Sequence, residues 1–553
     1  MSRSAQRLRA RREREQLSRR ELLKLGLVTG GAALVPAGRA RADDDDPPSP
    51  KIVPFQKDLL LPKVASPVRA FTVGPAEPQC SVDVPGFPDL PPPELYEVFL
   101  RTGQRELFPG KLTEFWGYDG SWPGPTFRVR RNHPIVLRVI NDLDLDGVDT
   151  EISVHNHGGH TPFGSDGFPD DFVFGGEFKD YCYPNVSPED DDSEFTSTQW
   201  YHDHAMDVTA HNVYMGMSGF YLLFDDLELD LIDSGVLPHH FFDIPLVFQD
   251  RRFDQDCQLL YNPMEHDGVL GDRYTVNGVI QPKLHVRRRK YRFRMLNGSN
   301  ARVYALRLSN GQSVTQIGND SWLLPNAVER PHLLLSMAER ADVVIDFTNA
   351  PNEVFLENIL EQEDGTGPDD LDDFKIPGTP LIKFIVYSGN PTLSVQRVAE
   401  GSTPDGPKDD ATIEPGDPLR PHVPITADEI VRTRHFVFDR EDGAWTINER
   451  FFDPDRDDAD PVLGTAERWI LENDSGGWVH PIHIHLEAHQ IQSLEERPLE
   501  PQDAAKKDTV LLGPDEVAEV YMKFRTFPGR FVFHCHNIEH EDMRMMGVFH
   551  VHE

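Results

Sequence analysis

Short runs in which apolar and polar residues alternate recur along the chain, most clearly over 126–141 (TFRVRRNHPIVLRVIN) and 283–297 (KLHVRRRKYRFRMLN). In the second run Tyr291, Phe293 and Met295 fall on one side, with arginines between them on the other. A period of two places successive side chains on opposite faces of a strand. Since 46 prolines and 41 glycines punctuate the chain, the pattern predicts an all-β protein of sandwiches or barrels, not a parallel α/β sheet.

The pattern also repeats on a larger scale. The segment 118–141 resembles 276–297, and a weaker third copy spans 445–473; each has a turn, a strand, a break and a second strand ending in asparagine. The copies lie roughly 155 to 170 residues apart, which indicates three related β-domains. An acidic, proline-rich segment precedes the third copy. We therefore predict domains over 43–228, 229–398 and 428–553, with a linker at 399–427.

The N-terminus has the pattern of an export signal. An arginine-rich start leads to twin arginines within Ser18–Lys24, then to an apolar run and to small residues at Ala40 and Ala42. This order predicts a signal peptide over 1–42, recognised by the Tat export machinery, and a periplasmic or extracellular protein. A basic amphipathic helix is the alternative. No other segment approaches 18 apolar residues, so we expect no stable membrane insertion.

Charge and cysteine content narrow the choice of partners. The chain carries 92 acidic and 55 basic residues, a formal net charge of −37. This charge argues against nucleic acid and anionic membranes, and it suits either a high-salt habitat or simply an acidic exported protein. The four cysteines form no CxxC pair, and we expect at most one disulfide among Cys80, Cys182 and Cys257. The fourth cysteine lies between two histidines.

That cysteine belongs to the segment HCHNIEHEDMRMM at 534–546, which concentrates metal-binding residue types. On a strand, His534 and His536 point to one face and Cys535 to the other, so one strand can reach two metal sites. A thiolate, two imidazoles and a distant thioether describe a blue-copper electron-transfer site. With Cys535 as the thiolate, we predict as its partners His540, Met545 (with Met543 and Met546 beside it) and, from HPIHIHLE at 480–487, His480.

Three further His-x-His units accompany the His534–His536 unit. Eight histidines are too many for one ordinary metal ion and suit a cluster of three coppers. Because the units come from the first and last predicted domains, we expect the cluster at their interface. The eight are His155, His157, His202, His204, His483, His485, His534 and His536. A lone unit also arises by chance, as at 550–552, and we expect surface or structural roles for His160, His211, His239, His240 and His489.

Together these motifs resemble the multicopper oxidase family: H-x-H-G, H-x-H, H-P-x-H-x-H and H-C-H-x3-H-x4-M occur in the family's order over nearly the whole mature chain. The segments 200–223 and 534–546 are most similar to bacterial spore-coat laccases and bilirubin oxidases, with phenoxazinone synthases as near neighbours. The resemblance implies three cupredoxin domains and four copper ions. It implies a type 1 copper at His480, Cys535, His540 and Met545, a type 2 copper at His155 and His483, and a type 3 pair at His157, His202, His204, His485, His534 and His536.

Two acidic residues match positions that help to protonate oxygen in the resembled enzymes. Asp166 lies nine positions after the second histidine of the first motif, and Glu541 directly follows His540. The Asp166-Gly167 pair also fits a simple turn, and Glu541 also fits ordinary solvation. The resemblance implies that these two carboxyl groups relay protons.

The resemblance implies an oxidase that uses O2 and a small reducing substrate, phenolic or an aromatic amine. Electrons are expected to enter at a solvent-edge histidine, His540 or His480, and to pass through Cys535 to its neighbouring histidines. The alternatives are a Cu(I) or Mn(II) oxidase, a bilirubin or phenoxazinone-type oxidase, a copper-binding electron carrier, and a two-domain nitrite-reductase type of enzyme. A carrier needs no eight further histidines, and the nitrite-reductase type lacks the full histidine set. The oligomeric state stays open.

Overall fold

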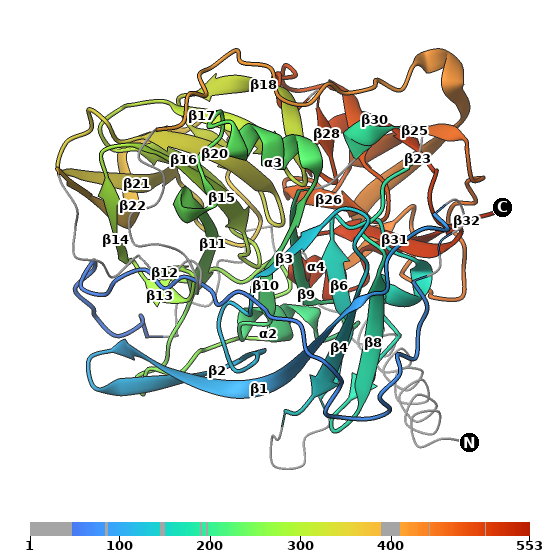
Figure 1. The fold of residues 1–553 in the computed structure, drawn as a ribbon, viewed down its shortest axis with the longest axis horizontal. Coiled ribbons are helices and arrows are strands. Elements are labelled where there is room, and N and C mark those ends of the chain that lie inside the picture. Colours follow the sequence, from blue (N-terminus) through green and yellow to red (C-terminus); the bar gives the residue numbers. More distant parts are fainter. Residues whose placement is uncertain are drawn as a thin grey trace, which may run out of the picture. The chain divides into compact units, whose positions relative to one another are not determined.

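The structure, a computed structural model, describes residues 47–553 apart from 83, 85, 86, 144–149, 189, 190, 195, 196, 389–409, 442 and 504. The predicted signal peptide over 1–42 and the first part of the predicted linker lie outside these residues. The described chain is built mainly of strands, which form six larger sheets and one two-stranded sheet (Figure 1). The predicted all-β fold is confirmed.

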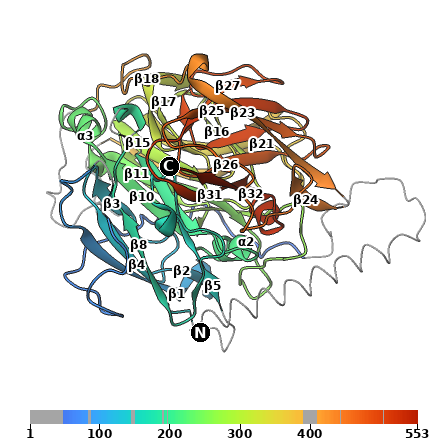
Figure 2. The same cartoon turned by 90° about the vertical axis from the view of Figure 1, so that its right-hand side faces the viewer.

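The six larger sheets group in pairs along the chain. No described sheet combines strands from two groups. We call the groups the N-terminal module (strands within 94–224), the middle module (243–387) and the C-terminal module (430–551). Figure 2 shows them from blue and teal through green and yellow to red. The predicted boundary at 228 falls within helix α3 (Asp226–Asp233), next to the last strand of the N-terminal module.

The N-terminal module packs two four-stranded sheets around an aromatic core that includes Tyr96, Phe127 and Tyr201. A disulfide joins Cys80 to Cys182, in keeping with at most one bridge among three cysteines. In sheet order the strands are β2 (Lys111–Tyr118), β1 (Glu94–Phe108), β4 (Ile135–Asn141) and β8 (Phe178–Tyr183), then β3 (Phe127–Arg130), β10 (Ser218–Phe224), β9 (Thr198–Asp203) and β6 (Val154–His157). Smaller elements are β5 (Glu151–Ile152), β7 (Val173–Phe174), η1 (Phe163–Ser165), η2 (Asp192–Glu194) and α2 (Thr209–Tyr214).

The middle module is the largest pair of sheets. Tyr291, Phe293 and Met295 point into its core, as their alternation predicted. One sheet holds β13 (Val279–Ile280), β12 (Arg273–Val276), β11 (Asp243–Arg251), β15 (Lys290–Asn297), β20 (Arg340–Asp346), β17 (Val314–Asn319) and β18 (Trp322–Arg330). The other holds β14 (Lys283–Arg287), β22 (Phe374–Tyr387), β21 (Glu353–Leu360), β16 (Tyr304–Leu308) and β19 (Leu333–Leu335), and η3 (His240–Phe242) precedes β11.

The C-terminal module carries the H-C-H segment. Its core gathers Trp469, Phe533 and Phe549. A six-stranded sheet holds β24 (Ala444–Ile447), β23 (Ile430–Glu441), β25 (Ala466–Asn473), β30 (Val517–Lys523), β27 (His489–Leu494) and β28 (Lys506–Lys507). A four-stranded sheet holds β29 (Thr509–Leu512), β26 (His480–Ile484), β31 (Gly529–Cys535) and β32 (Met546–Val551), and η4 (Ala427–Glu429) and α4 (Ile538–Asp542) complete the module.

The sequence repeat corresponds to a structural repeat. In each module the strand that ends the repeat pairs in parallel with an earlier strand, as in β1–β4, β11–β15 and β23–β25. The asparagine at its end is buried and donates its amide hydrogens to two backbone carbonyls. These are Thr150 and Val173 for Asn141, Arg302 and Leu335 for Asn297, and Trp478 and Gly513 for Asn473. The asparagine therefore fixes the loop that follows, and in the C-terminal module that loop leads to His480.

The preceding strand of the repeat is less regular. In the N-terminal module β3 and β4 lie in different sheets, and in the middle module so do β14 and β15. In the C-terminal module β24 and β25 lie in the same sheet. This difference fits the weaker similarity of the third copy. Among the described residues, no helix has the length and apolar character that crossing a membrane requires.

Candidate metal centre

One candidate site surrounds Cys535. The sulfur lies 3.3 Å from Nδ1 of His480 and 3.6 Å from Nδ1 of His540, and these two nitrogens are 3.2 Å apart. All three residues are fully buried. Burial raises the pKa of the Cys535 thiol well above its ordinary value, so an adjacent cation is required to stabilise the thiolate there.

Hydrogen bonds aim both imidazoles of this thiolate cluster at the sulfur. The Ser475 hydroxyl donates to Asn473, so it accepts from Nε2–H of His480 at 2.8 Å. Nε2–H of His540 donates to the Asp267 carbonyl at 3.1 Å. Each ring therefore keeps a free lone pair on Nδ1, the nitrogen nearest the sulfur, which is the arrangement a metal ligand needs.

Strand register and burial distinguish two of the neighbouring methionines, Met545 and Met546. Met546 stands opposite His534 across β31 and β32, and it packs with Phe168 on the side away from the thiolate cluster. Met545 is fully buried in the same apolar cluster as Cys535. Its backbone N–H donates to His540 and its carbonyl accepts from Cys535. The geometry thus favours Met545 over Met546 as the thioether at this site.

The eight histidines of the His-x-His units form a second buried group, the histidine cluster. Strand pairing sets it up, because His155 stands opposite His202 on β6 and β9, and His483 stands opposite His534 on β26 and β31. Figure 1 shows β6 and β9 of the N-terminal module beside α4 and β31 of the C-terminal module. Ligand atoms converge within 4.8 Å in the sets His157–His202–His536, His204–His485–His534 and His155–His483–His485.

The nitrogens of the histidine cluster need a cation. Nε2 of His534 lies 3.2 Å from Nε2 of His204 and 3.3 Å from Nε2 of His485. Because Nδ1–H of His485 donates to Asp166, Nε2 of His485 presents a lone pair towards His534. Nε2 of His155, His202 and His483, Nδ1 of His157 and both ring nitrogens of His536 are buried without a hydrogen-bond partner. Burial lowers the pKa of His536 to about 3, which keeps its ring neutral. Buried neutral imidazoles without partners fit metal ions.

Both predicted carboxyl groups lie against this cluster. Asp166 Oδ2 accepts from Nδ1–H of His485 at 2.7 Å, and Thr161 donates to Oδ1 at 2.9 Å. Burial raises the pKa of Asp166. Glu541 lies 3.1 Å from Nδ1 of His534 and 3.7 Å from Nδ1 of His204. Although burial alone raises the pKa of Glu541, these imidazoles outweigh it and hold the pKa well below the ordinary value.

The expectation of a solvent-edge histidine is wrong, because His480 and His540 are both fully buried. The Trp445 ring lies 3.8 Å from the His540 ring and is itself buried. Over it, the Arg440 guanidinium lies between Trp445 at 4.7 Å and the half-buried Trp478 at 4.4 Å. The indoles therefore separate the thiolate cluster from solvent.

Other residues at the centre were not predicted. Asp508 lies against the histidine cluster and pairs with Arg340. Asp508 follows two lysines and Arg340 begins strand β20, and neither position belongs to a recognised motif. Trp445 does lie in the third repeat copy, but the repeat gave no sign that it would face His540. Within the described residues, five sets of side chains have ligand atoms close enough together to hold a metal ion. None of these sets contains one of the five histidines for which surface or structural roles were expected.

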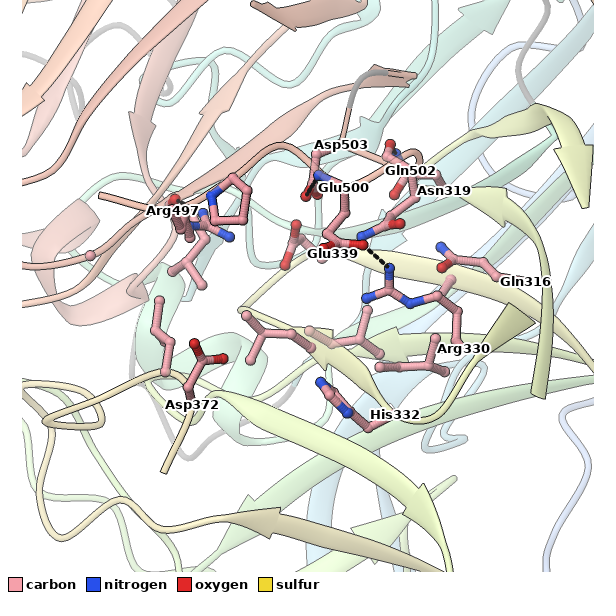
Figure 3. A pocket seen from close by; sticks show the side chains of 18 of the residues that line it. Gln316, Asn319, Arg330, His332, Glu339, Asp372, Arg497, Glu500, Gln502 and Asp503 are labelled. Atoms are coloured by element: carbon pink, nitrogen blue, oxygen red, sulfur yellow. Dashed lines mark hydrogen bonds and ion pairs between the residues drawn. The ribbon is translucent and has the colours of Figure 1, made fainter. Parts of the chain in front are cut away.

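A cavity of about 820 Å³ lies elsewhere, between the middle and C-terminal modules. Figure 3 shows Arg330 and His332 on one side and Glu500, Gln502 and Asp503 on the other. None of the predicted copper ligands lines it. Lys507 is among its lining residues and pairs with Glu339 at 2.8 Å and Asp320 at 3.2 Å. The cavity is therefore separate from both clusters.

A buried thiolate with two imidazoles, next to eight convergent imidazoles, defines a copper-dependent oxidoreductase. Sequence models of the family described as multicopper oxidase match 101–227 and 423–553. Bilirubin oxidase of Albifimbria verrucaria is 33% identical over 87% of this chain and 82% of its own length, and a laccase of Bacillus stratosphericus is 33% identical over 89% and 98%. A laccase structure from Pediococcus acidilactici superposes with a TM-score of 0.73, at 27% identity, over 93% of this chain and 98% of that chain.

The chain belongs to the multicopper oxidase family. It is a laccase-like, copper-dependent oxidoreductase with O2 as the electron acceptor, and its fold is of the cupredoxin-like type seen in these enzymes.

Proposed function

We propose that this oxidase couples four one-electron oxidations of a phenolic or aromatic-amine reductant to the four-electron reduction of O2 to two waters. Bound copper supplies the one-electron chemistry at both clusters. The protein contributes a fixed donor set, fixed ring tautomers and a buried, water-poor surrounding. The observation that carries the proposal is the pairing of a thiolate cluster with a histidine cluster through the adjacent residues 534, 535 and 536.

The proposed copper content is four ions per chain. The free Nδ1 atoms of His480 and His540, with Cys535 and Met545, suit the type 1 ion. The unpartnered Nε2 atoms of His155 and His483 suit the type 2 ion. Two sets of three histidines suit the type 3 pair, namely His157, His202 and His536, and His204, His485 and His534.

An aromatic reductant is favoured over a metal ion by the residues that cover the thiolate cluster. Trp478 and Arg440 are the partly exposed members of this cover, and the Trp445 ring behind them lies against His540. An indole face can stack with a phenol or an aniline, whereas the nearby Asp267 carboxylate, which could attract Cu(I) or Mn(II), is already paired with Arg440 at 2.7 Å. We propose that the reductant contacts the Trp478–Arg440 face and that its electrons pass through the Trp445–His540 contact.

The proposed proton relays are Asp166 and Glu541. Asp166 accepts a hydrogen bond from His485 and burial raises its pKa, so it can hold a proton beside the histidine cluster. Glu541 lies close to His534 and His204 as a carboxylate with a lowered pKa, so it can accept a proton and pass it on. Proton delivery by a positioned carboxyl group contributes about 10²- to 10⁴-fold in rate in comparable cases.

The reductant is tested by O2 consumption with a phenol, an aromatic amine, Cu(I) and Mn(II) as electron donors. We expect the two aromatic donors to be oxidised with the higher kcat/KM and Trp478→Ala to weaken them selectively. Tyr387→Ala, which removes a half-buried ring on the middle module, is the control. Faster turnover of either metal ion would contradict the aromatic assignment, and no O2 consumption with any donor would favour an electron carrier.

We also propose that the segment 1–42 directs Tat-dependent export to the periplasm or the extracellular space. The twin arginines and the small residues at 40 and 42 support it. Replacement of both arginines, Arg19 and Arg20, by lysine should retain the protein in the cytoplasm, as a cell-fractionation assay would show. Undiminished export would contradict the proposal.

A further inference from the structure

We infer that Asp508, held in place by Arg340 of the middle module, is a positioning residue that fixes two ligands of the histidine cluster at once. The inference rests on the proposed function, because it concerns how the copper ligands are held. The middle module carries no predicted ligand, so this arginine gives it a direct role at the centre.

Asp508 makes two different contacts to two stacked rings. Its carboxylate accepts from Nε2–H of His157 at 3.1 Å, and its backbone carbonyl accepts from Nδ1–H of His483 at 2.8 Å. The two imidazoles lie face to face, 3.6 Å apart with an angle of 16° between their planes. Because carboxylates and carbonyls only accept, each contact fixes a tautomer. Nδ1 of His157 and Nε2 of His483 are left with free lone pairs, and both atoms are buried without a partner.

Asp166 makes the matching pair of contacts on the other side of the cluster. Its carbonyl accepts from Nδ1–H of His155 at 2.6 Å and its carboxylate from Nδ1–H of His485 at 2.7 Å. Those rings are also stacked, 3.8 Å apart at 24°. Each aspartate thus serves one histidine of its own module through its main chain and one histidine of the other outer module through its side chain. Asp508 is the counterpart of Asp166 that the motifs did not reveal.

The surroundings of the two carboxylates differ. Asp508 Oδ1 accepts from Nη1 of Arg340 at 2.8 Å and from Thr509 at 3.0 Å, while Oδ2 accepts from Nη2 of Arg340 at 2.6 Å. Such a bidentate pair fixes the plane of a carboxylate. Asp166 has the Thr161 hydroxyl instead of a guanidinium. The Asp508 carboxylate is therefore held rigidly, as a positioning role requires.

Arg340 is itself held by three modules. It is fully buried and donates to the carbonyls of Thr198 on β9 and Ala338 beside β20, as well as to Asp508. Its Nη2 also donates to Ser321 at 2.5 Å. The chain after His157 leaves room for it, because Gly158 has φ of +83° and a side chain there would collide with Ser321 and Arg340. Placement of His157 and His483 consequently depends on the middle module.

The test is copper binding by Asp508→Asn and Arg340→Lys, each loaded with copper and compared with wild type by metal content per folded protein and by EPR. We expect both variants to keep the blue thiolate-copper band, which reports a folded C-terminal module. The apparent copper affinity of the histidine cluster should fall about 10- to 100-fold, as for outer partners of metal ligands, and the type 2 hyperfine splitting should change. Arg138→Gln, which breaks the buried bidentate pair with Asp180 in the N-terminal module, is the control and should leave both readings unchanged.

Wild-type affinity and an unchanged type 2 signal in both variants would overturn the inference while leaving the proposed function intact. Wild-type protein that binds no copper would instead overturn the proposed function. If Asp508→Asn does not fold, Arg340→Lys decides by the same readings, because lysine keeps the buried charge but cannot make the bidentate contact.

Discussion

The thiolate cluster and the histidine cluster differ in how much of the chain is needed to build each. His480, Cys535 and His540 all belong to the C-terminal module, and one module can bring them together. The eight histidines come from both outer modules, and Arg340 of the middle module adds a support. The ligands of the first site are therefore local, although the Asp267 carbonyl of the middle module helps to orient His540. The ligands of the second site meet only when the outer modules are assembled. The difference predicts that the two clusters respond separately to mutation and to solution conditions.

The largest effect is expected for Cys535→Ser. Loss of the thiolate should remove the blue band and lower the rate of substrate oxidation by more than about 100-fold. Loss of a residue that only hydrogen-bonds to a metal ligand costs up to about 100-fold, and loss of a ligand itself should cost more. The histidine cluster should still bind copper, as metal content and a type 2 EPR signal would show. Cys257→Ser, at a buried free cysteine outside both clusters, is the control. A Cys535→Ser protein without any bound copper would contradict the separation of the two sites.

The next effect concerns Asp166→Asn. An amide at this position can still hold the His485 ring but cannot deliver a proton, so O2 reduction should slow by about 100-fold. Bleaching of the blue band by substrate should keep its rate, and stopped-flow absorbance separates the two steps. Asp171→Asn, which removes a surface ion pair with Lys179, should change neither step. Equal slowing of both steps in Asp166→Asn would mean that this residue has a structural role only.

A smaller effect, confined to the thiolate cluster, is expected for Ser475→Ala. Without the hydroxyl, Nε2–H of His480 loses its acceptor and the ring its fixed orientation. Type 1 copper affinity should fall about 10-fold, measured by competition with a chelator and by the blue band. The type 2 EPR signal should be unaffected. A parallel change in that signal would contradict the expectation that the two clusters respond separately.

The smallest effect concerns the interface between the outer modules. Lys506 of the C-terminal module pairs with Asp191 of the N-terminal module at 3.0 Å. Although burial raises the pKa of Asp191, the Ser193 hydroxyl and Lys506 outweigh it and lower the pKa to about 2. Because the folded pKa is depressed, this stabilisation is fully present above about pH 4 and is lost as the pH falls towards 2.

Apoprotein should therefore lose stability to urea between pH 4 and pH 2, and Asp191→Asn should lose less over that range. Asp226→Asn, at an exposed pair with Arg130, is the control and should keep the wild-type pH dependence. An Asp191→Asn protein with the wild-type dependence would show that this pair does not stabilise the interface.

The sequence predicted what depends on local pattern. Alternation predicted the strands, and the repeat, whose copies end in Asn141, Asn297 and Asn473, predicted three modules. His-x-His spacing selected the side chains that converge. The sequence could not predict contacts made by single residues far apart in the chain. Asp508 meets His157 across 351 positions, and Arg340 meets Asp508 across 168. The burial of His540 under Trp445 likewise depends on tertiary packing, so the solvent-edge expectation failed.

We propose that one strand joins a thiolate copper site to a three-copper site. Copper quantitation on the purified wild-type protein, together with visible and EPR spectra, tests this proposal most directly. We expect four coppers per chain, a blue thiolate-copper band, and one type 1 and one type 2 EPR signal. A folded protein that binds a single copper, or that binds zinc at the histidine cluster and shows no type 2 signal, would contradict it.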